Sequence, residues 1–423
     1  MAKAVTIVAA GGVGVTNLGS LSGFGTPMTP VDAGGMAVTL LDAGGLPVVL
    51  INEDGTLWSA ESLVSAIALA AGGALFNPSD LTSLYQSRTG GSNSTSGSVV
   101  GIMLDKSYMG GQTAAAYIAG RPELVVNGNF ATDTNWTKAA GVTISGGAAN
   151  FAAVTNSSAL YQNIGATQGK WYSITYVVTR SAGTVQPQIN GTSASTGAAA
   201  SGTFTDVIYA SGASNGNFIF VASGFTGTID NVSVKEIPGF HAIAPSDAAR
   251  PTVTVSGGLA YLIADGVDDW MNVTPTLNLG EAWWHVGGWR SDTDGTNCFS
   301  LSSEGNGRSA YSRNGTAGHW ISSAPASTSI HAGNVSSIHV ATIEQTSTSS
   351  LSGRYNGAAG STITPYDDSG DTQGLALFSR RNTSWSGGIA GRFYGGAFAP
   401  GALSTENRAL AERLVAQWAG VTL

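Results

Sequence analysis

Large apolar residues alternate with small or polar ones through the middle of the chain. In the stretch KWYSITYVVT at 170–179, a large apolar residue recurs at about every second position. This is the pattern of a half-buried β-strand. Residues 217–221 and 227–237 show the same alternation, and Gly- and Ser-rich turns separate them. Gly supplies 59 of the 423 residues, and only 10% are charged, so short strands joined by tight turns are favoured over helices. We therefore expect an all-β fold.

The C-terminal part continues this pattern and ends in a helix. Ser404 is a good N-cap, Leu410, Leu414 and Trp418 share one helical face, and Gly420 stops the helix. Before the helix we expect strands at residues 259–263, 282–288, 338–343, 375–378 and 391–398.

The first 60 residues carry a short repeat. Residues 32–41 and 42–51 each consist of a turn with Asp and two Gly, followed by an apolar run. This predicts a small meander of about three strands, which is too small to be stable alone. Residues 61–76 predict a short helical linker ended by Gly72 and Gly73. We expect residues 1–76 to dock on a partner or on copies of this chain.

Charge and cysteine content exclude several classes of protein. The net charge is −8 and no Lys/Arg cluster exceeds the pair Arg380–Arg381, so we expect no nucleic-acid partner. The single cysteine, Cys298, cannot form an intrachain disulfide. The apolar run 63–75 has about 13 residues and is too short to span a bilayer. We expect no membrane insertion.

Catalytic spacing is missing as well. Glu281, Glu304 and Glu344 stand singly, although retaining glycoside hydrolysis needs two carboxyls about 5 Å apart. The cluster of Asp265, Asp268 and Asp269 has the spacing of a turn. We expect no enzyme, and a polysaccharide-degrading activity is the disfavoured alternative.

Aromatic residues divide into expected core and expected surface. Trp171, Tyr176 and Phe220 lie inside alternating strands and predict core positions. Trp283 and Trp284 are adjacent, so we expect one in the core and the other facing outward. Trp and Tyr in polar loops can stack on the apolar faces of sugars. The candidate sugar-binding residues in turn-rich contexts are Trp320, Trp385, Tyr311, Arg313 and Tyr366.

Two segments resemble known carbohydrate-binding domains. Residues 123–131 with Trp136, and residues 229–237, resemble the opening and closing of jelly-roll carbohydrate-binding modules. Residues 241–270 and 388–398 resemble concanavalin A-like (laminin-G-like) lectin domains. Fused behind a Gly-rich N-terminal segment, the two domain types resemble bacteriophage fibre, spike and tail proteins.

The resemblance implies a domain map. A small N-terminal β meander (residues 1–60) would anchor the chain in a virion, and a jelly-roll β-sandwich (122–238) would be inserted into a concanavalin A-like β-sandwich (77–121 and 239–423). Insertion at an exposed loop is tolerated when the ends of the insert lie close together. The C-terminal helix completes the fold.

The resemblance also implies a function. It indicates a structural adhesin on the surface of a phage-like particle that is assembled in the host cytoplasm, binds bacterial surface glycans and contacts other virion proteins through residues 1–76. It implies a homo-oligomer, with a trimer as the expected state. A structural calcium at Asn127, Asn129 and Asp230 is the one cofactor implied. A purely architectural capsid or tail protein without sugar binding is the alternative.

Overall fold

A computed structural model defines the fold, and the strands and caps below are those of its described residues. The described residues are 6–9, 48–51, 59–194, 197–213, 215–280, 282–292, 297–302, 308–313, 316–321, 328–329, 336–347, 350–363, 374–378, 380–381, 385–386 and 390–423. Within them the chain is mostly β, with large antiparallel sheets and a C-terminal helix. The expectation of an all-β sandwich is confirmed.

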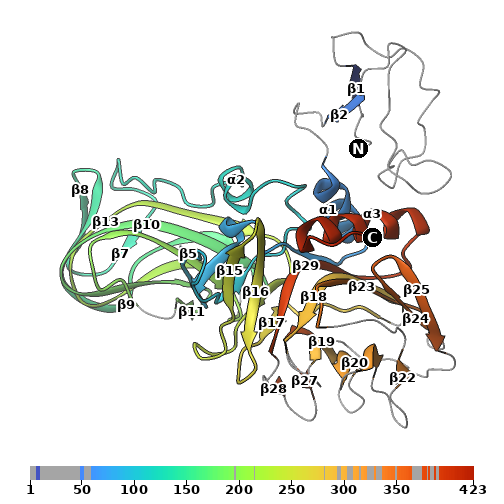
Figure 1. Ribbon diagram of the computed structural model, residues 1–423. Coiled ribbons are helices and arrows are strands. Elements are labelled where there is room, and N and C mark those ends of the chain that lie inside the picture. The colour runs from blue at the N-terminus through green and yellow to red at the C-terminus, as the bar shows by residue number, and fades with distance from the viewer. Residues whose placement is uncertain are drawn as a thin grey trace.

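One eight-stranded antiparallel sheet forms a layer of the sandwich nearest the C-terminus (Figure 1). Its central strands combine residues that lie more than 100 positions apart in the chain, and β3 extends it by pairing with β29. Its strands are β15 (Thr252–Ser256), β16 (Leu259–Asp265), β29 (Ala390–Pro400), β18 (Trp283–Ser291), β23 (His339–Ser347), β24 (Ser350–Tyr355) and β25 (Ala358–Ile363), with β3 (Ala74–Phe76) beside them.

A second layer packs against this sheet. Strand β6 precedes residues 122–238 and β14 follows them, yet β6 and β14 pair directly with each other. We call the two layers together the outer sandwich. The second layer contains β4 (Leu84–Ser87), β5 (Gly90–Asn93), β6 (Ile102–Met103), β14 (His241–Ile243), β17 (Met271–Thr274), β19 (Asn297–Ser302), β20 (Arg308–Arg313), β21 (Thr316–Ile321), β22 (Thr328–Ser329) and β26 (Gly374–Leu377). A 3₁₀ turn, η1 (Leu81–Ser83), precedes β4.

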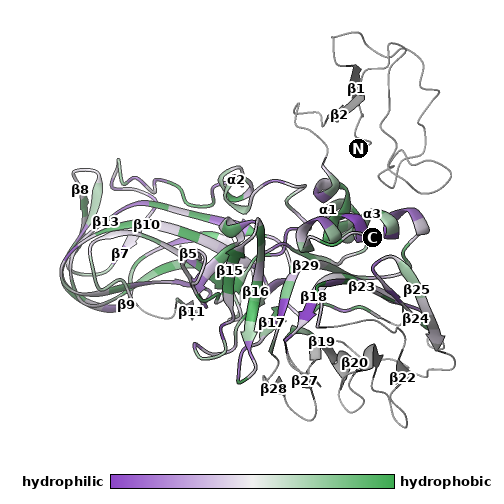
Figure 2. Cartoon of the chain, viewed as in Figure 1, coloured by the Kyte–Doolittle hydropathy of each residue, from purple (hydrophilic) through white to green (hydrophobic). Residues whose placement is uncertain are grey.

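Residues 122–238 form a sandwich of their own, the inner sandwich. Its three longest strands bend strongly (Figure 1) and are interrupted by bulges, so that a single strand serves both layers. Hydrophobic and hydrophilic stretches are mixed along them (Figure 2), and buried residues alternate with more exposed ones at 174–178 and 185–189 of the second long strand. The strands are β7 (Thr137–Lys138), β8 (Val142–Ser145), β9 (Ala148–Ala166), β10 (Trp171–Ile189), β11 (Thr192–Ser193), β12 (Gly202–Tyr209) and β13 (Gly216–Ile237).

Three helices accompany the sheets. α1 (Ala60–Ala70) and α3 (Thr405–Ala419) cover the outer face of the eight-stranded sheet, whereas α2 (Ala114–Ala119) leads into the inner sandwich. The predicted caps of α3 are confirmed, because the Ser404 hydroxyl accepts from the Asn407 N–H and Gly420 is left-handed at φ 67°. Within the described part of the chain, no helix is long and apolar enough to cross a membrane.

The covering helices correct one expectation. Trp283 points into the sandwich core, as expected of one of the pair. Trp284 points to the opposite face but is only 1% exposed, because α1 and α3 pack over it. The expected outward-facing Trp is therefore wrong. The Ser-, Thr- and Gly-rich sequence of residues 86–98 predicts a polar loop, but this stretch contains β5.

Near the N-terminus, β1 (Thr6–Ala9) pairs antiparallel with β2 (Val48–Ile51). β2 falls on the second repeat, as its apolar run predicts. The first repeat and the other turns of the expected meander lie outside the described residues, so the meander stays a prediction.

A continuous junction joins the two sandwiches. Val207 of β12 donates to the Thr89 carbonyl (2.8 Å), and Asp206 pairs with Gly90 of β5. Gly90 has φ +103°, and a Cβ there would come 2.6 Å from the Val207 nitrogen. Across the same junction, the Trp171 indole donates to the Thr274 carbonyl (2.8 Å). Trp171 is buried as expected, but at the junction and not in the inner core.

A buried polar pair sits where the chain leaves and re-enters the outer sandwich. The Asp105 N–H donates to His241 Nδ1 (3.0 Å). The Asp105 carboxylate in turn accepts backbone N–H groups of Leu75, Ser107 and Phe240. The two ends of the insertion are thereby held together.

Candidate functional site

The most concentrated group of ligating side chains lies just after β16. Asp265, Asp268 and Asp269 offer carboxylate oxygens that all lie within 4.8 Å of one another. Among the described residues, this is the one group of three or more His, Cys, Asp or Glu that could hold a metal ion. We call it the acidic loop. Oxygen-only donor sets of this kind suit a hard cation such as Ca²⁺, which takes about six to eight oxygen ligands.

The local sequence explains how the acidic loop is built. The Asp265 carboxylate accepts the N–H groups of Val267 (2.8 Å) and Asp268 (3.4 Å), which closes the turn. Asp269 then folds back, and its carboxylate accepts the Asp265 N–H at 3.0 Å. Asp269 is 6% exposed, whereas Asp265 lies in the solvent. The loop therefore offers one buried and two more accessible carboxylates.

The electrostatics of the acidic loop favour a cation. Burial raises the pKa of Asp269, the hydrogen bond from the Asp265 N–H lowers it, and the nearby charges of Asp265 and Asp268 raise it, so that the pKa lies at about 7. At neutral pH the Asp269 carboxyl is thus partly protonated, and a bound cation would displace that proton.

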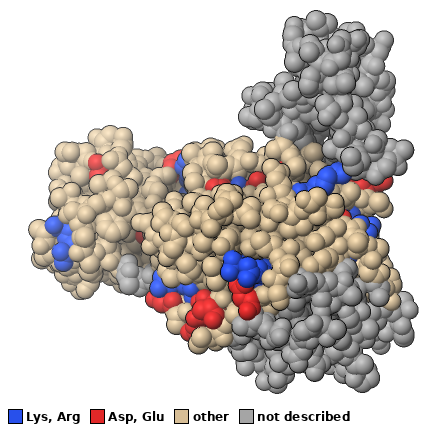
Figure 3. All heavy atoms as spheres, in the orientation of Figure 1, with Lys and Arg blue, Asp and Glu red and all other residues tan. Residues whose placement is uncertain are grey.

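An ion-pair cluster lies beside the acidic loop. Asp265 pairs with Ala390 across the sheet, and the Asp292 N–H donates to the Ala390 carbonyl (3.0 Å). The Asp292 carboxylate forms ion pairs with Nε of Arg290 (2.8 Å) on β18 and with Nε of Arg392 (2.9 Å) on the neighbouring strand β29. Charged side chains are sparse on the face in Figure 3, and small groups that mix both signs lie at its lower edge as well as along its upper edge. Acceptors and donors for hydroxyl groups therefore lie side by side here.

The acidic loop lies away from the helix-covered face. β16 begins at Leu259, which lies against Gly420 at the end of α3, and it ends at Asp265. The strand thus separates the acidic loop from α3, and Figure 1 shows α1 and α3 at one side of the outer sandwich and the loop between β16 and β17 at the other.

Three of the predicted sugar-binding residues lie on one hairpin of the second layer. Tyr311 of β20 pairs with Trp320 of β21, and Arg313 pairs with Thr316 in the same hairpin. Trp385 lies on β28 (Trp385–Ser386), where it pairs with Arg381 of β27 (Arg380–Arg381). Their side chains and all of Tyr366 lie outside the described residues. The sugar site at these residues stays a prediction.

The predicted calcium residues lie in two adjacent loops of the inner sandwich. The Val232 N–H donates to the Gly128 carbonyl (2.8 Å), which brings the loops together. The Asn127 amide donates to the Thr132 and Thr134 carbonyls. The carboxylate of Asp230 accepts both the N–H and the amide of Asn231. Asn129 accepts weakly from Ala131 at 3.4 Å.

These side chains are thus engaged within their own loops, and a single carboxylate is present among them. The three residues fit a calcium ion less well than the acidic loop does. Sequence reasoning passed over the acidic loop because its spacing resembles a turn. The signal was three Asp within five residues.

Neither the comparison with protein-family models nor the search of curated proteins returned a match for this chain.

Proposed function

We propose that this chain is a structural adhesin of a phage-like particle and binds bacterial surface glycans through its β-sandwiches. The observation that carries the proposal is the acidic loop beside the Arg290–Asp292–Arg392 cluster, at the side of the outer sandwich away from α1 and α3. Binding, not catalysis, is the role that we assign to these groups.

The donor chemistry supports glycan recognition. Carboxylates accept hydrogen bonds from sugar hydroxyls, and guanidinium groups donate to ring and hydroxyl oxygens. When Ca²⁺ is bound, it offers further positions for vicinal hydroxyls, since its coordination shell is flexible. Asp265, Asp268 and Asp269 would hold the ion. The aromatic residues Trp320 and Trp385 would add stacking surface.

The position of α1 supports attachment at the opposite side. α1 follows the N-terminal segment and is packed on the outer sandwich, so residues 1–76 would contact other virion proteins while the acidic loop faces the host. A homo-oligomer, with a trimer as the expected state, would multiply weak single-site affinities. The particle surface is the proposed location, after assembly in the host cytoplasm.

Binding of the full chain to purified host surface polysaccharide and to host cells, with Ca²⁺ or with chelator, tests the proposal. We expect saturable binding that chelator weakens at least tenfold and that Asp268→Asn weakens comparably. Asp247→Asn is the matched control, because the Asp247 side chain is 77% exposed and lies outside the acidic loop. The Trp320→Ala/Trp385→Ala double variant tests the stacking residues separately.

Absence of binding by the folded full chain to any host polysaccharide would contradict the adhesin proposal. It would favour the architectural alternative, a capsid or tail protein that has no sugar site. Binding that ignores both chelator and Asp268→Asn would move the site away from the acidic loop.

A further inference from the structure

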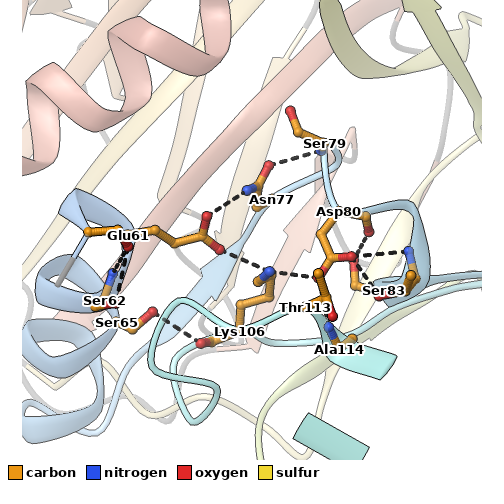
Figure 4. A network of polar contacts seen from close by, with 12 residues as sticks. Glu61, Ser62, Ser65, Asn77, Ser79, Asp80, Ser83, Lys106, Thr113 and Ala114 are labelled. Carbon is orange, nitrogen blue, oxygen red and sulfur yellow. Dashed lines mark hydrogen bonds and ion pairs between the residues drawn. The ribbon is translucent and has the colours of Figure 1, made fainter. Parts of the chain in front are cut away.

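A buried lysine lies between two carboxylates at the base of the outer sandwich (Figure 4). The Lys106 side chain is 2% exposed, and its Nζ lies 2.6 Å from Asp80 Oδ2 and 2.9 Å from Glu61 Oε1. The three residues come from different elements: Glu61 from the first turn of α1, Asp80 from the turn before β4, and Lys106 from the segment after β6. The function proposed above does not use them.

The Asp80 carboxyl group is held by donors on both oxygens. Oδ1 accepts the Thr82 N–H (3.1 Å) and the Thr82 hydroxyl (2.6 Å), and Oδ2 accepts the Ala114 N–H (2.8 Å). Such donors polarise a carboxyl group and stabilise negative charge that develops on Oδ1 during nucleophilic attack on its carbon. Asp80 is therefore surrounded like an electrophile in acyl transfer.

Glu61 is placed to move a proton. Its Oε2 accepts the Asn77 side-chain amide at 3.1 Å. Its buried Oε1 lies close to the Lys106 amine but has no hydrogen-bond partner among the described residues. A carboxylate oxygen in this position can take a proton from the amine and return it to a leaving oxygen.

We propose that Lys106 and Asp80 condense to an intramolecular amide cross-link, with Glu61 as the proton carrier. The lone pair of Lys106 Nζ attacks Asp80 Cγ after Glu61 has taken a proton from the amine. The Cγ–Oδ2 bond then breaks, and Oδ2 leaves as water with one proton returned by Glu61 and a second proton lost from Nζ of the adduct. Glu61 thereby regains its carboxylate form. An ammonium and a carboxylate become an amide and one water, so no oxidant, cofactor or outside proton is needed.

Burial supplies the driving force. Two carboxylates and one ammonium in a water-poor site are costly to desolvate, and an amide removes one charge of each sign. Fixed contact between amine and carboxyl also replaces a bimolecular encounter, with effective molarities of about 10⁵ M or more in well-oriented cases. Burial alone would raise the pKa of Asp80, but Lys106 and the hydrogen bonds outweigh it and hold that pKa below its usual value. The starting state is therefore the ion pair, and Glu61 opens the route to the neutral amine.

The test is the intact mass of the denatured full chain. We expect a mass lower than that of the sequence by one water molecule. Trypsin should then fail to cut after Lys106, and residues 4–88 and 89–138 should appear as one branched species. This map also separates the cross-link from cyclisation at Asp-Gly sites such as Asp265–Gly266, which loses the same mass elsewhere.

Two variants complete the test. Lys106→Arg keeps a positive charge but cannot form the amide, so its mass should match its sequence. Glu61→Gln keeps the shape of the side chain but cannot carry the proton, and it should also remain uncondensed. The full sequence mass in the unaltered protein, with normal cleavage after Lys106, would overturn the proposal. A cross-link that still forms in Glu61→Gln would overturn the role of Glu61.

Discussion

The inner and outer sandwiches are built from similar strands but are held together differently. The inner one is held by its own aromatic core, in which Phe218 contacts both Trp136 and Phe220 edge to face. The outer one needs helices from both ends of its sequence, and buried charges tie the C-terminal helix down. Arg408 of α3 pairs with Glu344 of β23, and Glu412 of α3 accepts from Arg354 and Thr342.

The difference teaches where function can be placed. A self-contained core can be inserted or removed as a unit, whereas the outer sandwich is closed by helices that lie far from its central strands in the sequence. α1 contacts α3 through the apolar cluster that includes Trp284. These helices cover the eight-stranded sheet, and strand β16 of that sheet ends at the acidic loop. A pulling force on residues 1–76 would therefore act on the outer sandwich before it acts on the inner sandwich.

The largest expected effect comes from removing one core aromatic in each region. Trp284→Ala and Phe220→Ala should each lower the free energy of unfolding by about 3–5 kcal/mol, because both side chains are fully buried. Hydrogen exchange should show faster opening of α1 and α3 for Trp284→Ala only. Equal acceleration of both regions by either variant would mean that the two cores are one cooperative unit.

The junction should respond to pH. Burial lowers the pKa of His241 to about 3, so its contribution to stability is present above pH 6.5 and is lost as the pH falls towards 3. Burial raises the pKa of Asp105 to about 6, so its contribution is present below pH 3.8 and is lost as the pH rises through 6. Between about pH 4 and 6 the two trends oppose each other.

In Asp105→Asn, the loss of stability at low pH that comes from His241 should no longer be opposed by Asp105. In that variant the free energy of unfolding should fall by about 3 kcal/mol more than in the unaltered protein between pH 6.5 and 4, since about two pKa units are removed from the opposing side. Denaturant titrations at the two pH values measure it. An unchanged pH profile would show that Asp105 is ionised alike in the folded and unfolded states.

Loss of the buried Glu412 carboxylate of α3 should have a smaller effect on stability. Glu412→Ala leaves Arg354 and Thr342 without their shared acceptor and should cost about 2 kcal/mol. Glu406→Ala on the same helix is the control, because Glu406 is exposed, and it should change stability by less than about 0.5 kcal/mol. Denaturant midpoints of the two variants provide the comparison. Similar midpoints would contradict the claim that the contacts of Glu412 stabilise the packing of α3.

The smallest expected effect on stability compares a hydrogen bond across the junction with one inside the inner sandwich. Trp171→Phe removes the indole bond to Thr274 across the junction, and Trp136→Phe removes an equivalent bond to Asn127 inside the inner sandwich (3.1 Å). Each should cost about 1 kcal/mol. Limited proteolysis should free the inner sandwich more readily in Trp171→Phe alone. Release in both variants, or in neither, would remove the distinction.

Much of this fold follows from local pattern, and the rest depends on remote partners. β10 and the caps of α3 follow from alternation and from Ser404 and Gly420. β5 does not follow from the pattern, because its sequence GGSN has no large apolar side chains that could alternate with polar ones. Trp284 was misjudged because α3, more than 100 residues away in sequence, covers it. Likewise, the approach of Arg392 and Asp292 to the acidic loop depends on strand pairing across about 100 residues, which no local pattern carries.

The most direct measurement for the central claim is a hydrogen-exchange footprint of the full chain with and without bound host polysaccharide in Ca²⁺. The account predicts protection at residues 261–270 and at 290–292 and 390–392, with the inner sandwich unchanged. We also expect Asp268→Asn to remove the protection and Asp247→Asn to keep it. Protection confined to residues 122–238, or no protection at saturating polysaccharide, would contradict the claim that the acidic loop of the outer sandwich contacts the glycan.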